Sequence, residues 1–184
     1  MLNHKGTVTI ETDRLILRRF AMEDAEAMYR NWASDDEVTK HLTWPTHSSV
    51  EISKMVLTDW TSHYPEPDFY NWAIVLKENG PEPIGNISVV GIDNKVDAAM
   101  MGYCMSRAHW RKGIMAEALT AVIAFLFDQV GFNRIEADHD PNNPASGRVM
   151  EKSGMRHEGI LRQAGRSNQG IIDVSRWAIL KSDC

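Results

Sequence analysis

The sequence predicts one α/β domain, and three observations support that prediction. The stretch from Ala98 to Leu119 reads as an uncharged strand, a short basic turn that contains Gly113, and the start of a long amphipathic helix. Two strand-like runs precede it and are joined by a dense cluster of turn-forming residues. The 184 residues are 43% hydrophobic and 24% charged, which is typical of a globular chain long enough to bury a core.

The composition also excludes several classes of function. A formal net charge of -5 argues against binding through a general basic field, so no direct nucleic-acid binding is expected. Cys104 and Cys184 form no disulfide framework, and neither they nor the seven histidines have metal-ligand spacing, so we expect no metal. Residues 1–11 lack a signal-type apolar core and no apolar run could cross a bilayer, which predicts a cytoplasmic protein without a membrane partner.

The first third of the chain is predicted to form a strand and two helices. Apolar and basic residues alternate over Thr12–Phe20, which indicates a half-buried strand with solvated arginines. The next helix has one apolar stripe, made of Ala25, Met28, Tyr29 and Trp32. After a loop over Ser34–His47, Ser48 and Glu51 match a capping box and predict a second helix. The residues expected to share its apolar face are Ile52, Met55, Val56 and Trp60.

The middle of the chain is predicted to be an antiparallel meander followed by the long helix. Strands are expected over Phe69–Lys77, Ile84–Ile92 and Ala98–Met105, because turn residues separate these runs. After Gly113, apolar residues recur at helical spacing for about five turns until Gly131 ends the helix. These residues are Met115, Ala118, Leu119, Val122, Ile123, Leu126, Phe127 and Val130.

The last part of the chain is predicted to contain three more strands and a short helix. Asn133–Asp138 reads as a strand, and the pair Asn143-Pro144 then places a capping residue before a proline at the first helical position. The helix should run from Pro144 to about Ser153 and end at Gly154. Strands over Met155–Arg162 and Ile171–Leu180 surround a polar loop at Ala164–Gly170. No repeat or linker divides residues 1–184, so we expect a single domain with its core at about residues 12–181.

The basic turn before the long helix is a candidate anion site. The first turn of a helix has free backbone N–H groups and the positive end of the helix dipole. Gly113 would let an anion approach the backbone, and Arg111 and Lys112 add positive charge. A basic loop with a helix that only packs explains the same residues. A P-loop is excluded, because the stretch lacks the second glycine and the Gly-Lys-Ser/Thr ending.

The order of these elements resembles the GNAT acetyltransferase fold over about Thr12–Lys181. Two segments are the most specific, Trp110–Leu119 and Asn143–Met155, the latter followed by Glu158-Gly159. Together they are similar to the branch that contains the ribosomal-protein N-terminal (alanine/serine) acetyltransferases. The resemblance implies a mixed, mostly antiparallel sheet, flanked by helices and splayed at a cofactor cleft.

The same resemblance implies that acetyl-CoA is the cosubstrate. The signature Gln/Arg-x-x-Gly-x-Gly/Ala falls on Trp110, Gly113 and Met115. Trp110 and Met115 differ from the residues that the signature specifies, and Gly113 matches it. Met115 lies on the apolar stripe and is expected to point to the core instead of crowding the pyrophosphate. The residues implied to bind the cofactor are Cys104 and Met105 along the pantetheine, Arg111, Lys112, Gly113, Ile114, Met115 and Ala116 around the pyrophosphate, and Asn143.

The catalytic residues implied by the resemblance are incomplete. Ser146 resembles a serine near the thioester sulfur and could donate to the departing thiolate, although a serine that only caps its helix is an alternative structural explanation. Met150 stands where many GNAT enzymes have a tyrosine. A nucleophilic role for Cys104 is disfavoured, because nothing nearby would activate its thiol.

A general base is missing at both positions where the resemblance implies one. The strand Ala98–Met105 has no acid or histidine, and Gly165 stands where close relatives have a glutamate. Other candidates remain, each with a sensible structural role, and none is selected: Glu117, Asp138, Glu158 and Asp173. Asp138-His139-Asp140 is more simply explained as the end of a strand.

The acceptor is expected to lie between the loop Lys40–His47, with Trp44 and Trp72, and the hairpin loop Ala164–Gly170, although the two tryptophans could equally serve only to fill the core. The sequence therefore predicts an acetyl-CoA-dependent N-acetyltransferase that transfers acetyl directly to a protein or peptide N-terminal α-amine, as in ribosomal-protein acetylation. A small-molecule amine and a non-catalytic acyl-CoA-binding module are the alternatives, and a homodimer is left open.

Overall fold

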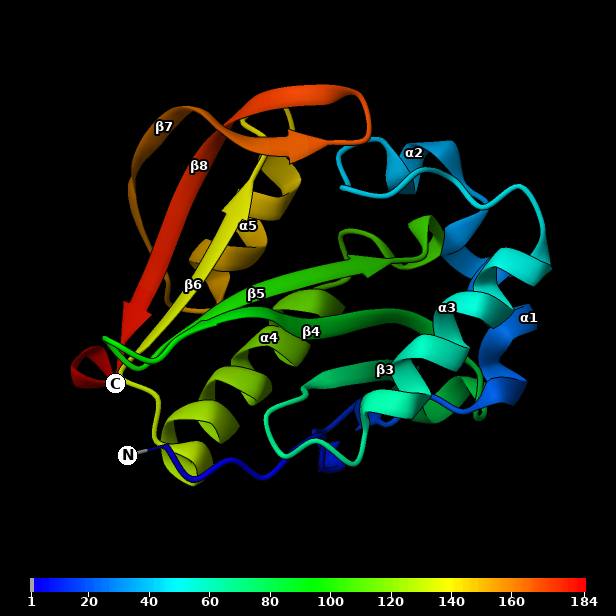
Figure 1. Cartoon of the computed structure of the whole chain (residues 1–184), viewed down its shortest axis with the longest axis horizontal. Coiled ribbons are helices and arrows are strands. Elements are labelled where there is room, and N and C mark those ends of the chain that lie inside the picture. The colour runs from blue at the N-terminus through cyan, green and yellow to red at the C-terminus, as the bar shows by residue number, and fades with distance from the viewer. Residues whose placement is uncertain (1) are drawn as a thin grey trace.

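The computed structural model describes residues 2–184, and one eight-stranded sheet runs through them in the order β1-β2-β3-β4-β5-β6-β8-β7 (Figure 1). The strands are β1 (Ile10–Glu11), β2 (Leu15–Arg18), β3 (Asn71–Leu76), β4 (Pro83–Asp93), β5 (Ala98–Met105), β6 (Arg134–His139), β7 (Arg156–Ser167) and β8 (Gly170–Leu180). The helices are α1 (Ala25–Met28), α2 (Asp36–Thr39), α3 (Val50–His63), α4 (Ile114–Phe125) and α5 (Pro144–Lys152). One π-helical turn extends α1 over Tyr29–Ala33, and another extends α4 over Leu126–Val130.

The predicted meander is confirmed. Strands β3, β4 and β5 pair antiparallel in sequence order, with Ile87 of β4 opposite both Trp72 and Tyr103. Gly80, in the turn between β3 and β4, has φ +85°, a conformation that glycine adopts without the clash of a Cβ. The turn-forming residues between the strands therefore favour the antiparallel pairing of β3, β4 and β5.

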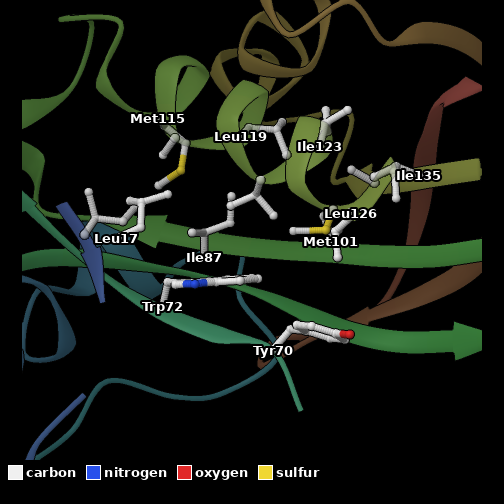
Figure 2. Close-up of a cluster of buried hydrophobic side chains, with 14 of the residues drawn as sticks. Leu17, Tyr70, Trp72, Ile87, Met101, Met115, Leu119, Ile123, Leu126 and Ile135 are labelled. Atoms are coloured by element: carbon white, nitrogen blue, oxygen red, sulfur yellow. The ribbon is translucent and has the colours of Figure 1, made fainter. Parts of the chain in front are cut away.

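The long helix α4 packs on one face of this meander. All eight apolar positions predicted for it are buried, and Figure 2 shows Met115, Leu119 and Ile123 of the helix facing Ile87 and Met101 of the sheet. Burying one large aliphatic side chain contributes roughly 1.5–3 kcal/mol, so this face anchors the helix. Gly131 ends the helical segment with φ +96°. The prediction for this element is confirmed from its first residue to its last.

The opposite face of the meander is covered by the first helices. A second apolar cluster joins residues of α1 and α3 to the sheet, and its members include Phe20, Met28, Trp32, Leu57 and Cys104. Because side chains alternate along a strand, Tyr103 and Met105 face the α4 side while Cys104 faces the α1 side.

Strand β5 pairs with β6 along only half of its length. Parallel pairing runs from Ala98 opposite Arg134 to Met101 opposite Ala137, and it stops there. Residues 102–105 stay paired with β4, while β6 continues along β8. Figure 1 shows the two strands diverging toward their carboxyl ends. The splay implied by the resemblance is confirmed, and it leaves one edge of β5 without a neighbouring strand.

The capping box predicted for the second helix is wrong. Helix α3 is capped by Ser49, one residue later than predicted, and no side chain makes the capping hydrogen bond. The predicted apolar face is confirmed in part, because Val56 and Trp60 pack against the second cluster while Met55 is 72% exposed. Leu57 and Ser53, which the prediction did not include, are fully buried. The tightly packed cluster around Leu57 determines which face turns inward, and Met55 is left in solvent.

Two predicted loops are partly regular structure. The segment Ser34–His47 contains α2, whose first turn is capped by Asp35, since its Oδ1 accepts from the Glu37 N–H at 3.0 Å. The polar loop predicted at Ala164–Gly170 belongs mostly to strands β7 and β8, which join through a turn at residues 168–169. No helix within residues 2–184 has the length and apolar character needed to cross a membrane.

Candidate active site

The turn between β5 and α4 forms a concave run of backbone amides. Arg111 and Gly113 both have left-handed backbones, with φ +61° and +75°. Such residues, alternating with ordinary ones, turn successive N–H groups toward one side, and this arrangement is the amide nest that binds anions in other proteins. The first hydrogen bond of α4 runs from the Glu117 N–H to the Gly113 carbonyl at 3.1 Å, so the amides of residues 114–116 lie ahead of it. The side chains of Arg111 and Lys112 are exposed beside them.

Trp110 and Met115, the two residues that depart from the signature, both have structural roles. The indole Nε1 of Trp110 donates to the carbonyl of Met105 at 2.8 Å, which ties the turn to the end of β5. Met115 is buried in the core against the sheet, as predicted (Figure 2). Neither side chain therefore obstructs the amide nest.

Glu117 is held by hydrogen bonds next to the nest and is not free to act as a base. Its carboxylate accepts from the Thr12 hydroxyl at 2.5 Å and from Nε of Arg14 at 2.6 Å. Arg14 also donates to the carbonyl of Lys112 at 3.1 Å, so the ion pair joins the residue before β2 to the turn. Burial raises the pKa of Glu117, but the hydrogen bonds from Thr12 and Arg14 outweigh it and hold that pKa below its ordinary value.

A tyrosine from β5 reaches α5 across the gap where β5 and β6 have separated. The hydroxyl of Tyr103 lies 2.9 Å from Oγ of Ser146 and 3.2 Å from its carbonyl oxygen. Burial raises the pKa of this phenol, although its hydrogen bond to Ser146 acts in the opposite direction, so it remains protonated at neutral pH. The resemblance placed Tyr103 in the strand segment expected along the pantetheine, beside Cys104 and Met105, but assigned it no chemical role. Met150 is buried and offers no hydroxyl.

The start of α5 carries the two remaining predicted site residues. Asn143 caps the helix without a side-chain capping bond, so its amide is not committed to the helix end. The backbone N–H of Ser146 donates to the carbonyl of Asn143 at 3.1 Å. Gly147 lets the helix approach β6, because a Cβ there would lie 2.8 Å from Nε2 of His139. The structure thus brings Asn143 and Ser146 to the same end of the β5–β6 gap as Tyr103.

Cys104 lies on the other side of β5. Its thiol is buried and donates to Oδ1 of Asn86 at 2.9 Å. Burial raises the pKa of this thiol to about 12, so it is not ionised at neutral pH. A nucleophilic thiolate at this position is therefore disfavoured by the structure as it is by the sequence.

The remaining candidate bases are held in structural interactions. Asp138 is paired with Arg176, and Glu158 is paired with both terminal nitrogens of Arg134. The hydrogen bonds from Arg134 lower the pKa of Glu158. Asp173 accepts from the Gln163 N–H at 2.8 Å. These contacts favour the structural role that the sequence left open for each of them.

Gly165 has a steric reason to be a glycine. A Cβ at this position would clash with Cγ1 of Val174 on the paired strand. Strand β7 also shifts register against β8 between Leu161 and Gly165. A glutamate side chain does not fit here against Val174, so the packing of the hairpin explains why this position lacks the implied base.

The loop Lys40–His47 lies against the tip of the β7–β8 hairpin, beside α2 in Figure 1. Asn168 holds it there, since its N–H donates to the Leu42 carbonyl at 2.8 Å and its Nδ2 donates to the carbonyls of Thr39 and Trp44. Trp44 is partly exposed on this loop. Trp72 is fully buried in the core and donates to the Val8 carbonyl at 2.6 Å, so of the two roles left open for it the core role is confirmed and the acceptor-site role is wrong.

A histidine–carboxylate pair, missed by sequence reasoning, joins this loop to the end of β6. Nδ1 of His41 lies 2.8 Å from Oδ2 of Asp140, 99 residues away in the chain. The second carboxylate oxygen of Asp140 accepts from the Asn142 N–H at 2.8 Å. Burial raises the pKa of Asp140, but these hydrogen bonds hold it below its ordinary value. No group of three or more His, Cys, Asp or Glu residues within residues 2–184 is placed to hold a metal ion.

Known proteins are similar to this chain in sequence and in fold. Residues 14–156 match the family model of the acetyltransferase (GNAT) domain. A Bacillus subtilis protein described as an uncharacterized N-acetyltransferase, YoaA, is 33% identical over 172 residues, which cover 94% of this chain and 96% of that protein. The ribosomal-protein-serine acetyltransferase of Escherichia coli is 29% identical over 139 residues, covering 74% of this chain and 75% of that protein. Among solved structures, a ribosomal L7/L12 alpha-N-protein acetyltransferase in complex with coenzyme A has a TM-score of 0.82 at 21% identity, covering 94% of this chain and 98% of that one.

Proposed function

The chain belongs to the GNAT acetyltransferase family, and on that premise we propose that it transfers acetyl from acetyl-CoA to the α-amine of a protein or peptide N-terminus. The observation that supports this most strongly is the alignment of three features along the β5–β6 gap. The amide nest follows the carboxyl end of β5, and the unpaired edge of β5 runs along the gap. The Tyr103–Ser146 pair connects β5 to α5 across the gap. Each feature suits one part of an acyl-CoA molecule.

The amide nest suits the pyrophosphate. The backbone N–H groups of residues 111–116 and the charges of Arg111 and Lys112 would bind its oxygens. The pantetheine arm would continue along the free edge of β5 at Cys104 and Met105, with their backbone groups as partners, and would meet Asn143 from α5. The side chain of Cys104 has no part in this binding, because it faces the other side of the sheet.

Ser146 would assist the departing thiolate. Coenzyme A leaves as a thiolate, and a hydroxyl within reach of the sulfur stabilises it by donating a hydrogen bond or a proton. Tyr103 fixes the hydroxyl of Ser146 at the gap and cannot itself ionise at neutral pH. The pair therefore presents a protonated hydroxyl group at the place proposed for the thioester.

An N-terminal α-amine suits a site without a strong carboxylate base. The pKa of an α-amine is about 8, whereas that of a lysine side chain is about 10.4, so far more of the α-amine is neutral at about pH 7. The loop Lys40–His47 lies against the turn at residues 168–169. The partly exposed Trp44 gives this surface an aromatic side chain against which a peptide could bind. The relative from Escherichia coli, whose name describes a ribosomal-protein-serine acetyltransferase, supports this acceptor class.

Acetyl transfer to a panel of acceptors tests the proposal. Peptides with free serine or alanine N-termini are compared with the same peptides blocked at the N-terminus but carrying one lysine, and with small primary amines. We expect kcat/KM to be highest for the free α-amines and product mass spectra to locate the acetyl group there. Preference for a small amine would replace the acceptor assignment, and absence of turnover with every acceptor, despite acetyl-CoA binding, would refute the proposal.

A further inference from the structure

We propose that His41 is the general base that takes the proton from the acceptor amine, and that Asp140 is the residue that positions it. The inference rests on the proposed function and assigns to it the base that the sequence lacks. Its foundation is the contact between Nδ1 of His41 and Oδ2 of Asp140 at 2.8 Å, which links the acceptor loop to the strand that borders the cofactor gap.

The hydrogen bond determines which nitrogen of His41 can accept a proton. An ionised carboxylate can only accept hydrogen bonds, so Nδ1 of His41 must carry the hydrogen that it shares with Asp140. The neutral imidazole then has its lone pair on Nε2. Within residues 2–184, Nε2 of His41 takes part in no hydrogen bond or ion pair. The ring is therefore held in the tautomer that a general base needs.

The position of the pair relative to Ser146 follows from a short series of hydrogen bonds. The Asn143 N–H donates to the Asp140 carbonyl at 2.7 Å, and the Ser146 N–H donates to the Asn143 carbonyl at 3.1 Å. Asp140 thus stands at the strand end from which the helix carrying Ser146 begins. On its other side, His41 belongs to the loop that Asn168 fixes to the β7–β8 hairpin. The pair therefore connects the proposed acceptor loop to the segment that leads into the helix carrying Ser146.

The exposure of the two side chains fits a division of roles. Asp140 is 9% exposed and His41 is 22% exposed, so the carboxylate is sheltered while the imidazole remains reachable by a substrate or a water molecule. Glu117, Asp138 and Glu158 are instead engaged by arginines. His41 is consequently better suited to take a proton than any of these carboxylates.

The proposed step balances in atoms and charge. The acceptor arrives as an ammonium ion and gives one proton to Nε2 of His41, directly or through one water molecule. The free amine attacks the thioester carbon, a C–N bond forms, and the C–S bond breaks. The nitrogen loses its second proton to the departing thiolate through the Ser146 hydroxyl, and His41 releases the first to solvent. The products are the acetylated amine, coenzyme A as a thiol, and one proton.

The test compares His41→Asn with His63→Asn in the full chain. Asparagine can still donate to Asp140 but cannot take a proton, so kcat for the preferred acceptor should fall about 10²-fold or more, while the Kd for acetyl-CoA stays within about twofold. His63 is a matched control, because it forms the same kind of pair with Glu66 at 2.8 Å on the exposed end of α3. Its variant should keep the wild-type kcat.

A second pair of measurements separates a base from a structural histidine. Added imidazole should restore part of the rate to His41→Ala, because a diffusible base can replace the lost one. Nitrogen NMR of the wild-type histidines should show His41 protonated on Nδ1 and not on Nε2, and this readout needs no activity. A His41→Asn variant that keeps kcat within about threefold of wild type, or an Nε2-protonated ring, would overturn the inference while leaving the proposed function standing. A wild-type chain inactive with all amines would refute the proposed function itself.

Discussion

The hydroxyls of Tyr103 and Ser146 lie 2.9 Å apart and connect strand β5 to helix α5 across the gap between β5 and β6. This contact fixes a serine hydroxyl in the first turn of α5, where solvent would otherwise let it rotate freely. It also gives Ser146 a tertiary partner, which a serine that only caps its helix does not need. The pair therefore offers a direct test of the proposed chemistry.

Ser146→Ala should lower kcat by roughly 10²- to 10⁴-fold and leave the Kd for acetyl-CoA nearly unchanged. The reason is that help to the thiolate is needed mainly in the transition state. Steady-state kinetics and calorimetry measure the two quantities, and Glu151→Gln, an exposed position on the same helix, is the control. An unchanged kcat with weakened binding would show that Ser146 only positions the cofactor.

Tyr103→Phe should lower kcat by about 10-fold, because the ring remains and only the partner of Ser146 is lost. If Tyr103 acts through Ser146, the double variant should be no slower than Ser146→Ala alone, since residues that act as a unit are not additive. Measuring kcat for all four proteins closes this double-mutant cycle. Fully additive losses would mean that Tyr103 contacts the reacting groups independently.

Gly113→Asp should weaken acetyl-CoA binding at least 10-fold more than Gly113→Ala does. Both variants carry the strain of a side chain at φ +75°, on the order of 1–2 kcal/mol, but only aspartate places a negative charge beside the proposed pyrophosphate site. A Cβ at this position would lie 3.7 Å from a nitrogen of Arg14, so alanine fits. Calorimetry on the folded variants measures the difference, and equal affinities would move the pyrophosphate away from this turn.

Cys184 should react with iodoacetamide in the native protein at about pH 8, while Cys104 should not. Cys104 is buried and its pKa is raised to about 12, so almost no thiolate is present at that pH, whereas Cys184 is exposed. Peptide mass spectrometry should find one label in the native protein and two after denaturation. Rapid native labelling of Cys104 would mean that β5 opens from the sheet.

Glu158→Gln should cost stability at neutral pH without abolishing activity. The pKa of Glu158 is lowered by Arg134, so the ion pair contributes stability above the unfolded-state pKa and loses it as the pH falls through the folded-state pKa. The carboxylate is 41% exposed, so the contribution should stay within about 1 kcal/mol. Denaturation curves should converge for the two proteins at acid pH. A thousandfold slower turnover by the folded variant would instead identify Glu158 as a base.

Some parts of the molecule follow from neighbouring residues in the chain and were predicted correctly. The eight buried positions of α4 and its end at Gly131 are set by helical spacing and by one left-handed residue. The meander from β3 to β5 follows in the same way from strand runs separated by turn formers. The family motifs likewise pointed to the turn that forms the amide nest, because that turn and the start of the helix are one continuous segment.

Other features depend on contacts between segments that the sequence does not connect. The start of α3 and the exposure of Met55 were mispredicted, because the packing around Leu57 decides which residues of the helix turn inward. Trp72 was a candidate for the acceptor site and lies in the core, since β3 is an interior strand of the sheet and is buried along its whole length.

The amino-acid sequence by itself determined the order of the main elements, but not the short β1 and α2, and it also determined the long helix, the family and the candidate cofactor-side residues, because each of these follows from a contiguous pattern. Only the tertiary structure decided which side chains meet at the gap. The sheet brings Tyr103 to Ser146 over 43 residues, and the β7–β8 hairpin helps bring His41 to Asp140 over 99. Such pairs leave no periodicity in the chain, because their geometry depends on sheet register and on the splay of two strands.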